Sequence, residues 1–280
     1  MFAINKRIPY FIQLEVTLIK SILKKTGCTM FNTIAQEHIM SYNDIAAANF
    51  ETRIKQNPYP GRGIIIGKSD DATWQIVYWI MGRSTNSRNR RFVVDGTDIR
   101  TEPVDLSQLT DPSLIIYDAM LELPGLFLVS NGDQTRTIYD TINAGNSFED
   151  ALMTRMHEPD APNFTPRISG MIDLRNKTPR VTMSILKSSI LSSNVSDRNF
   201  FRLQFPVSGF GYGITTYQGD GNPLPGFSGD PVLLPLKGNA SQIIDIYWNA
   251  LNQENLVSLA VKTISSVDKS SSIIVKNKHD

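Results

Sequence analysis

Segments with the pattern of β-strands occupy most of the sequence after residue 62, and the helical patterns are grouped between them. β-Branched and aromatic residues at 63–82, interrupted by the polar turn 70–73, predict a β-hairpin. Further strands are predicted at 92–95, 113–121, 125–129, 167–174, 180–187, 200–207, 211–217, 256–265 and 271–276. Strands in runs with grouped helices are typical of antiparallel sheets covered by helices. The sequence therefore predicts an α+β fold with one sandwich domain.

The helical patterns have clear start and stop signals. They are predicted at 33–56, 135–144, 148–156 and near 240–252. The first stops at Asn57-Pro58-Tyr59-Pro60-Gly61, which is a strong breaker. Ser147 is a good N-cap for the third helix, with Asp150 in the capping-box position. A loop rich in glycine and proline at 219–231 separates the last helix from the strands before it.

Charge, cysteine and histidine content exclude several classes of protein. The chain has 28 basic and 27 acidic residues, a balance that argues against a general nucleic-acid binder. The single cysteine, Cys28, cannot form an intrachain disulfide, which suits a reducing compartment. The three histidines are far apart and none is close to a cysteine in a metal-binding spacing, so we expect no metal site.

Residues 1–31 differ from the rest of the chain. They are basic, with apolar residues at helical spacing, but the run is too polar to span a bilayer and has no signal-peptide pattern. We therefore expect a dispensable N-terminal extension followed by a single domain at 32–280, no integral membrane segment and a cytoplasmic location. The alternative for the extension is an amphipathic helix that lies on a membrane surface.

Two turns next to predicted strands contain arginine among small residues. Tyr59-Pro60-Gly61-Arg62-Gly63 leads into the hairpin, and its glycines permit close approach of the backbone to a ligand. The segment 82–91 contains four arginines and no acid, together with serine, threonine and asparagine. Such side chains suit a phosphate or a polar ring. The simpler alternative for both segments is a surface turn with solvated arginines.

Two later segments place polar groups beside helix ends. The segment 129–135 is a strand-to-helix turn, where backbone N–H groups attract anions, although a plain Asn-Gly turn is an equally good interpretation. The segment 157–167 contains three prolines, which stiffen it. It also contains two carboxylates, Glu158 and Asp160, and one arginine, Arg167. A carboxylate held beside a guanidinium suits general acid–base catalysis. The alternative is a solvated connector with an internal ion pair, in which His157 is structural.

Together these segments resemble the archaeal-type IMP cyclohydrolase family. The residues of the motifs are more similar to those of its longer bacterial members. The resemblance covers residues 57–218, and its matching blocks are 59–69, 78–90, 130–135 and 163–170, with weaker agreement at 111–118 and 216–217. It implies closure of the purine ring of 5-formamidoimidazole-4-carboxamide ribotide to inosine monophosphate, without metal or cofactor. It also implies a four-layer αββα sandwich similar to the N-terminal nucleophile hydrolases.

The resemblance and the chemistry of ring closure suggest roles for particular residues. The formyl oxygen gains negative charge and leaves as water, so it needs a cationic group and an acid, while the carboxamide N–H needs an acceptor. We expect Arg88 to polarise the formyl oxygen, Tyr117 to donate a proton, and Glu158 to orient or deprotonate the carboxamide, with Asp160 as the fallback carboxylate. Candidates for the 5′-phosphate, ribose or base are Arg62, Arg83, Asn131, Gly132, Asn163 and Arg167.

Two other functions are compatible with the sequence. One is a purine-nucleotide-binding relative without turnover. The other is an amidohydrolase of the N-terminal nucleophile type, which would need a Ser, Thr or Cys exposed by processing. If the protein is a cyclohydrolase, we expect it to bind a small purine ribotide and not to bind nucleic acid. A homo-oligomer is compatible with the sequence, which does not fix the oligomeric state.

Overall fold

Two antiparallel sheets form the centre of the protein. The computed structural model describes residues 41–109, 112–205 and 207–279, so the expected extension at 1–31 and the start of the first expected helix lie outside the described residues. The six-stranded sheet has the order β11-β10-β1-β2-β12-β13 and the seven-stranded sheet the order β3-β4-β5-β6-β7-β8-β9. Every neighbouring pair of strands is antiparallel.

The bounds of the elements are as follows. The six-stranded sheet contains β1 (Gly63–Lys68), β2 (Trp74–Met81), β10 (Phe210–Thr215), β11 (Val232–Pro235), β12 (Leu256–Ile264) and β13 (Ser271–Asn277). The seven-stranded sheet contains β3 (Arg91–Asp95), β4 (Asp98–Glu102), β5 (Asp118–Leu123), β6 (Leu126–Ser130), β7 (Arg167–Asp173), β8 (Arg180–Ser188) and β9 (Ser196–Leu203). The helices are α2 (Tyr42–Asn49), η2 (Phe50–Lys55), α3 (Thr85–Arg88), η3 (Leu106–Gln108), α4 (Gln134–Asn143), α5 (Phe148–Met153) and α6 (Ala240–Ala250).

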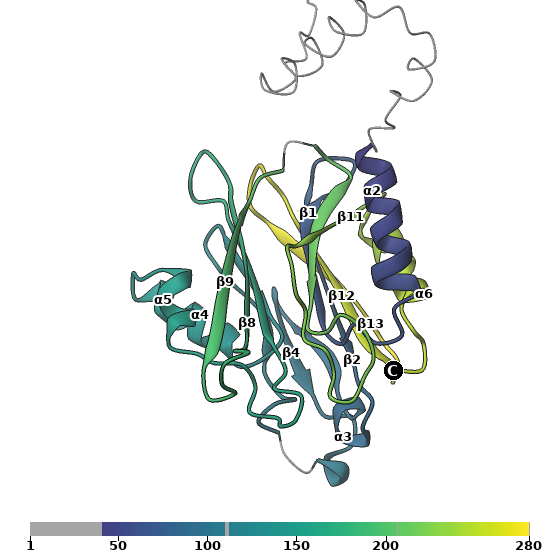
Figure 1. The fold of residues 1–280 in the computed structure, drawn as a ribbon. Coiled ribbons are helices and arrows are strands. Elements are labelled where there is room, and N and C mark those ends of the chain that lie inside the picture. Colours follow the sequence, from purple (N-terminus) through teal and green to yellow (C-terminus); the bar gives the residue numbers. More distant parts are fainter. Residues whose placement is uncertain (1–40, 110–111, 206, 280) are drawn as a thin grey trace, which may run out of the picture. The chain divides into compact units, whose positions relative to one another are not determined.

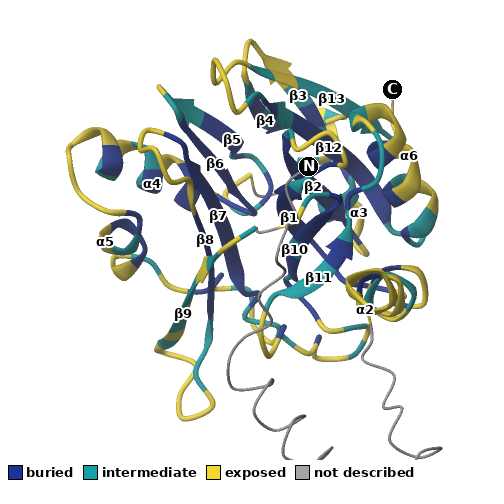
Figure 2. Ribbon diagram, turned by 90° about the horizontal axis from the view of Figure 1, so that it is seen from above, coloured by how far each residue is buried: buried dark blue, intermediate teal, exposed yellow. Residues whose placement is uncertain are grey.

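The sheets pack face to face, and helices cover their outer faces. Because side chains alternate along a strand, Ile64 and Ile66 of β1 enter the core between the sheets, whereas Ile65 packs on the other face. That other face is covered by α2, η2 and α6, while α4 and α5 cover the outer face of the seven-stranded sheet (Figure 1). Figure 2 shows the strands buried between these helical layers. The expected four-layer αββα sandwich is confirmed, and its similarity to the N-terminal nucleophile hydrolases stays a prediction.

Most expected strands and helices are present, and some of them begin or end at other residues than expected; the strand expected at 200–207, for example, is β9 at Ser196–Leu203. The hairpin, the helix at α4 and the Ser147 cap are confirmed; Ser147 and Asp150 form both hydrogen bonds of a capping box. The expected strand at 113–121 was wrong in its first half, because 112–116 form a turn in which Ile115 and Ile116 N–H both donate to Pro112 O. β4 and β11 were not expected.

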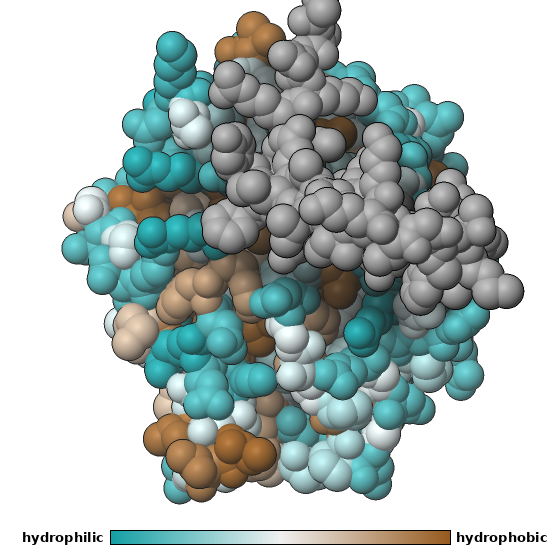
Figure 3. All heavy atoms as spheres, turned by 45° about the horizontal axis from the view of Figure 1, so that its top comes forward, coloured by the Kyte–Doolittle hydropathy of each residue, from teal (hydrophilic) through white to brown (hydrophobic). Residues whose placement is uncertain are grey.

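The remaining surface features are ordinary for a folded domain. Tyr42–Asp280 cluster as one compact unit. On the face drawn in Figure 3, hydrophilic side chains are interspersed with apolar ones. Ile190 and Leu191, at the turn between β8 and β9, are almost fully exposed. No helix in the described part of the chain is long and apolar enough to cross a membrane.

Strand pairing brings four distant turns to one end of the sandwich. Gly63, where β1 begins, lies opposite Trp79 near the end of β2 and opposite Thr215 at the end of β10. In the other sheet, Ser130 at the end of β6 lies opposite Ser169 near the start of β7. The segments that precede or follow these positions are those that the sequence singled out for chemistry. They therefore meet around one region.

Candidate functional site

A buried ion pair joins the two sheets at this end. Arg62 Nη1 is 2.8 Å from Glu158 Oε1, and Arg62 Nη2 is 3.0 Å from Glu158 Oε2. The two side chains are only 8% and 4% exposed. Arg62 Nη1 also donates to Asn131 O at 3.0 Å. The bidentate geometry fixes the plane of the carboxylate and ties the loop after α5 to the start of β1.

Burial changes the acid–base properties of this pair. Burial raises the pKa of Glu158, and the opposing effect of the Arg62 guanidinium does not cancel it. For Arg62 itself, burial lowers the pKa, but the charge of Glu158 and the proximity of Tyr117 bring the net pKa well above its ordinary value. Arg62 therefore stays cationic. Glu158 is a stronger base than a solvated carboxylate, as a proton acceptor in catalysis requires.

A pocket of about 300 Å³ opens beside the ion pair. It lies between the turn before β1, the segment around α3 and the loop 157–167, and its wall combines cations, carboxylates and amides with a few apolar side chains. Its lining residues are Tyr59, Gly61, Arg62, Met81, Arg83, Ser84, Asn86, Ser87, Arg90, Leu114, Ile115, Glu158, Asp160, Asn163, Thr165, Tyr217 and Leu224. The volume suits a small ligand.

Arg90 is the most informative residue in this wall. It is 3% exposed, yet its Nε and Nη1 have no hydrogen-bond partner among the described residues. Asn86 Oδ1, also in the wall, is likewise buried without a partner. Unpaired buried polar atoms are costly, so the pocket calls for a ligand that offers acceptors to Arg90 and a donor to Asn86. The sequence drew attention to this arginine-rich segment but gave no reason to choose Arg90 among its four arginines.

Arg83 and Arg88 belong to the same segment, but only Arg83 is among the described residues that line the pocket. Arg83 lines the mouth of the pocket, donates to Asp220 Oδ1 and Gly221 O, and stacks on the Tyr59 ring at 5.0 Å. Arg88 donates from Nε to Gly82 O at 2.8 Å and from Nη2 to Asn255 Oδ1 at 3.0 Å. It is not one of the described residues that line the pocket. Arg88 is thus outside the described pocket wall, and its catalytic role stays a prediction.

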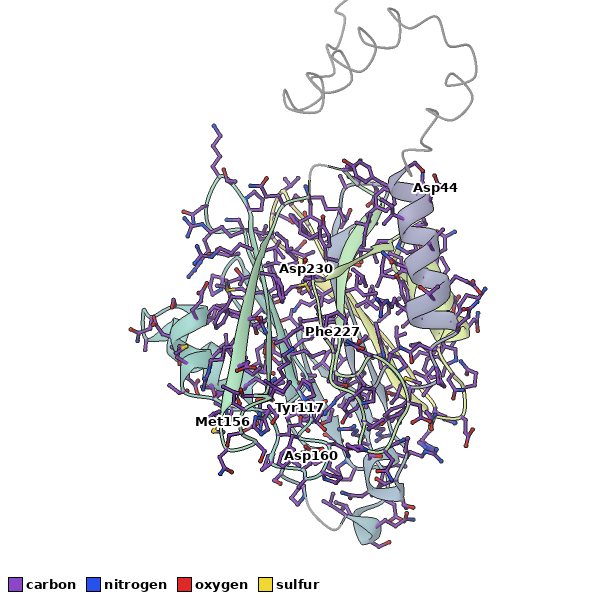
Figure 4. The ribbon with its side chains drawn as sticks, in the orientation of Figure 1. Asp44, Tyr117, Met156, Asp160, Phe227 and Asp230 are labelled. Atoms are coloured by element: carbon purple, nitrogen blue, oxygen red, sulfur yellow. The ribbon has the colours of Figure 1, made fainter. Side chains whose placement is uncertain are left out.

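Tyr117 lies behind the ion pair. Its hydroxyl is 2.7 Å from the hydroxyl of Tyr78 on β2, and it is 6% exposed. Burial raises the pKa of Tyr78 well above its ordinary value. Figure 4 shows Tyr117 and Asp160 at the same end of the sheets. Tyr117 is not in the described lining of the pocket, although it is close enough to influence Arg62.

The loop 157–167 forms one wall of the pocket and is held by its own side chains. Asp160 Oδ1 accepts from Thr165 N at 2.6 Å, and Thr165 Oγ1 bonds both Asp160 and the Tyr217 hydroxyl. Burial raises the pKa of Tyr217 to about 12, so it stays protonated. Asn163 Oδ1 accepts from Leu224 N at 3.0 Å, which attaches the loop to the segment 219–231. Asp160, the fallback carboxylate, and Asn163, an expected binding residue, both line the pocket, and their roles stay predictions.

The other three expected binding residues lie outside the pocket lining. Asn131 uses its side chain to hold Pro166 O and the N–H of Ile168. A Cβ on Gly132 would lie 2.7 Å from Arg167 Nη1 and 2.8 Å from Gln134 Oε1, so a larger residue there would displace these side chains. Arg167 donates to Asp133 and Gln134 and lines a different cavity. These residues shape the backbone behind Glu158. Within the described ranges, no group of three or more His, Cys, Asp or Glu side chains is arranged to hold a metal ion.

Comparison with known proteins gives a consistent result. A family model described as "IMP cyclohydrolase-like protein" matches residues 59–269. A protein named IMP cyclohydrolase from Methanothrix thermoacetophila is 34% identical over 122 residues, which is 42% of this chain and 59% of the relative. Proteins of the same name from Methanococcus maripaludis and Methanocella arvoryzae are 26% and 32% identical, over 57% and 41% of this chain and 75% and 57% of their own length. The chain thus spans less than two thirds of two of these relatives.

Proposed function

The chain belongs to the IMP cyclohydrolase-like family, and from this premise we propose that it closes the purine ring of 5-formamidoimidazole-4-carboxamide ribotide to give inosine monophosphate and water. The observation that carries the proposal is one pocket whose lining contains both Glu158 and Arg90, a buried arginine whose Nε and Nη1 have no hydrogen-bond partner among the described residues. Arg90 supplies a stabiliser of negative charge, and Glu158 supplies a proton acceptor.

The reaction needs little covalent help from the protein. The carboxamide nitrogen attacks the formyl carbon of the same molecule, a C–N bond forms, and the formyl oxygen leaves as water. The two hydrogens of that water come from the carboxamide and the formamido nitrogens. Because both reacting groups belong to one molecule, holding them in a near-attack geometry supplies much of the acceleration. The remaining tasks are proton transfer and stabilisation of the oxyanion.

The contacts support the following roles. Glu158, oriented by Arg62, accepts a proton from the carboxamide nitrogen. Arg90 stabilises the charge on the formyl oxygen, in place of Arg88, because its Nε and Nη1 are unpaired in the pocket wall. Asn86 Oδ1 accepts the second carboxamide N–H, which would satisfy its missing hydrogen bond. An amide acceptor and a carboxylate then hold one NH₂ group between them.

The other candidates fit supporting roles. Arg83 is proposed to bind the 5′-phosphate at the mouth of the pocket, with Asp160 and Asn163 near the ribose or base. Arg88 would hold Gly82 and Asn255 in place, and Tyr117 would act on Arg62 through the Tyr78 pair. We also propose a cytoplasmic location and a dispensable segment 1–31. A chain without residues 1–29 is expected to keep its ring-closure activity.

A spectrophotometric ring-closure assay on the purified chain tests the function. The chain is incubated with the formamido ribotide, with and without a chelator, and the formation of inosine monophosphate is followed by absorbance. We expect turnover that the chelator does not reduce and that Glu158→Gln abolishes. Thermal stabilisation by inosine monophosphate without any turnover would instead identify a non-catalytic binder. Cleavage before a Ser, Thr or Cys, seen by mass spectrometry, would favour the amidohydrolase alternative.

A further inference from the structure

A second cavity lies on the other side of the loop 157–167. It has a volume of about 460 Å³ and is bounded by this loop, the end of α5 and the turn between β8 and β9. The side chains of the loop are divided between the two spaces: Glu158, Asp160 and Asn163 line the substrate pocket, and His157, Phe164 and Arg167 line the second cavity. The loop is therefore a shared wall that is one chain thick.

The charge around this cavity is positive. Arg155 and Arg167 both line it, and both bond the same carboxylate, that of Asp133. Next to it, Arg198 binds only backbone carbonyls, including that of Arg155 at 2.6 Å, and has no carboxylate partner among the described residues. Arg155 and Arg167 thus share one carboxylate and Arg198 has none in the described ranges, while Glu158 and Asp160 line the other pocket. Arginine in such a setting binds oxyanions, and phosphate above all, through its planar fork.

Two rings also line the cavity, those of His157 and Phe164, and both residues are held by contacts within the protein. The rings of His157 and Phe164 pack edge to face with centroids 5.5 Å apart. The His157 Nδ1 lies 2.7 Å from Ser196 Oγ, and the His157 N–H donates to the same hydroxyl at 2.9 Å. A cavity with two arginines on one side and flat rings on another matches a small molecule that has both a phosphate and an apolar or aromatic part.

We propose that this cavity is a second ligand site, which takes a small phosphorylated metabolite and is distinct from the substrate pocket. Its occupant changes the substrate pocket through the shared loop. The loop transmits the change because Glu158 N–H donates to Thr165 O at 2.9 Å, so the two ends of the wall move together. Arg167 also acts electrostatically on Glu158, and an anion that engages Arg167 weakens that action. This regulatory part rests on the proposed function, whereas the binding part does not.

Phosphate binding to matched variants of the full chain tests the proposal without any need for turnover. Arg83→Ala removes the proposed phosphate contact of the substrate pocket and Arg90→Ala removes its buried cation, so inorganic phosphate titrated calorimetrically into the Arg83→Ala/Arg90→Ala variant reports on the second cavity. We expect this background variant to bind one phosphate, and we expect adding Arg155→Ala to weaken that binding by about tenfold or more, since a charge-assisted contact is lost. Arg202→Ala is the control, because Arg202 also pairs with an acid, Glu149, but lies outside this cavity.

Hydrogen exchange supplies the second measurement. Phosphate added to the Arg83→Ala/Arg90→Ala background variant is expected to slow amide exchange in 157–167, and the same variant with Arg155→Ala added is expected to show no such change. Circular dichroism confirms that each variant is folded. The proposal is overturned if the Arg83→Ala/Arg90→Ala background variant binds no phosphate, or if Arg155→Ala and Arg202→Ala have the same effect in that background. Either outcome leaves the proposed ring closure untouched, because no step of the test uses the substrate.

Discussion

At the scale of single residues, two features define the site: a buried ion pair, and a buried arginine that lacks hydrogen-bond partners among the described residues. Arg62 and Glu158 satisfy each other, whereas Arg90 presents two buried nitrogen atoms with no partner in the described structure. A protein that tolerates this cost in the wall of a pocket gains a preorganised donor for a ligand. The residue that the sequence nominated, Arg88, has its guanidinium bonded to protein groups.

The two arginines can be separated by substitution. If Arg90 stabilises the oxyanion, Arg90→Ala is expected to lower kcat by about 10²–10³-fold, the usual effect of removing such a donor. Arg88→Ala is the matched control, and we expect a smaller loss because Arg88 contacts only protein groups. Steady-state kinetics on the formamido ribotide give both values. A larger loss for Arg88→Ala than for Arg90→Ala would restore the role first expected for Arg88.

The buried pair makes a prediction about stability. Arg62→Met leaves the Glu158 carboxylate buried and unpaired, and breaking such a pair costs about 3–5 kcal/mol of unfolding free energy. The double variant Arg62→Met/Glu158→Leu removes both charges and is expected to recover much of this loss. Urea unfolding measures all three proteins. Equal unfolding free energies of the single and double variants would show that an unpaired Glu158 carboxylate is not the cause of the loss.

The pH dependence of activity follows from the raised pKa of Glu158. As a proton acceptor Glu158 acts in its ionised form, so kcat/KM is expected to fall as the pH drops through a pKa above that of an ordinary glutamate. Arg167 lowers the pKa of Glu158, so Arg167→Gln is expected to move this acidic limb to higher pH, while Arg167→Lys moves it less. An acidic limb that stays in place in Arg167→Gln would argue against Glu158 as the titrating group.

At the scale of elements, local patterns predicted those strands and helices whose apolar residues recur regularly. The hairpin of β1 and β2 is apolar on both faces because it is buried between the other sheet and α6. β4 was missed because its sequence, DIRTE, contains only Ile99 as an apolar residue; its place comes from pairing with β3 and β5. β11 is similarly defined by its partner β10. Such pairings depend on residues that are distant in sequence.

The capping box of α5 is an element-scale feature that the sequence predicted fully. Ser147 Oγ accepts from Asp150 N at 3.0 Å, and Asp150 Oδ2 accepts from Ser147 N at 3.0 Å. Ser147→Ala is expected to cost about 0.5–2 kcal/mol of unfolding free energy, as loss of an N-cap does. Thermal or urea unfolding measures it, with the exposed Ser228→Ala as control. A cost equal to that of the control would mean that α5 is held by its packing alone.

At the scale of the whole described domain, the fold explains why distant segments form one site. The turn before β1 and the loop before β7 belong to different sheets, and the contact between Arg62 and Glu158 joins positions 96 residues apart. The sequence singled out both segments, because their glycines, prolines and charges are typical of functional loops, and the structure places Glu158 in the wall of the pocket. The sequence could not show that Asn131 and Arg167 are absent from the described lining of the pocket, since the side of a loop to which each residue projects is set by contacts that no local pattern contains.

The most direct measurement is a crystal structure of the chain with inosine monophosphate bound. The central claim is that ring closure occurs in the space shared by Glu158 and Arg90. We therefore expect the purine within hydrogen-bond distance of Glu158 and Asn86, with C2, the former formyl carbon, facing Arg90. A nucleotide bound only in the cavity of Arg155 and Arg167, with the space beside Glu158 empty, would contradict the claim.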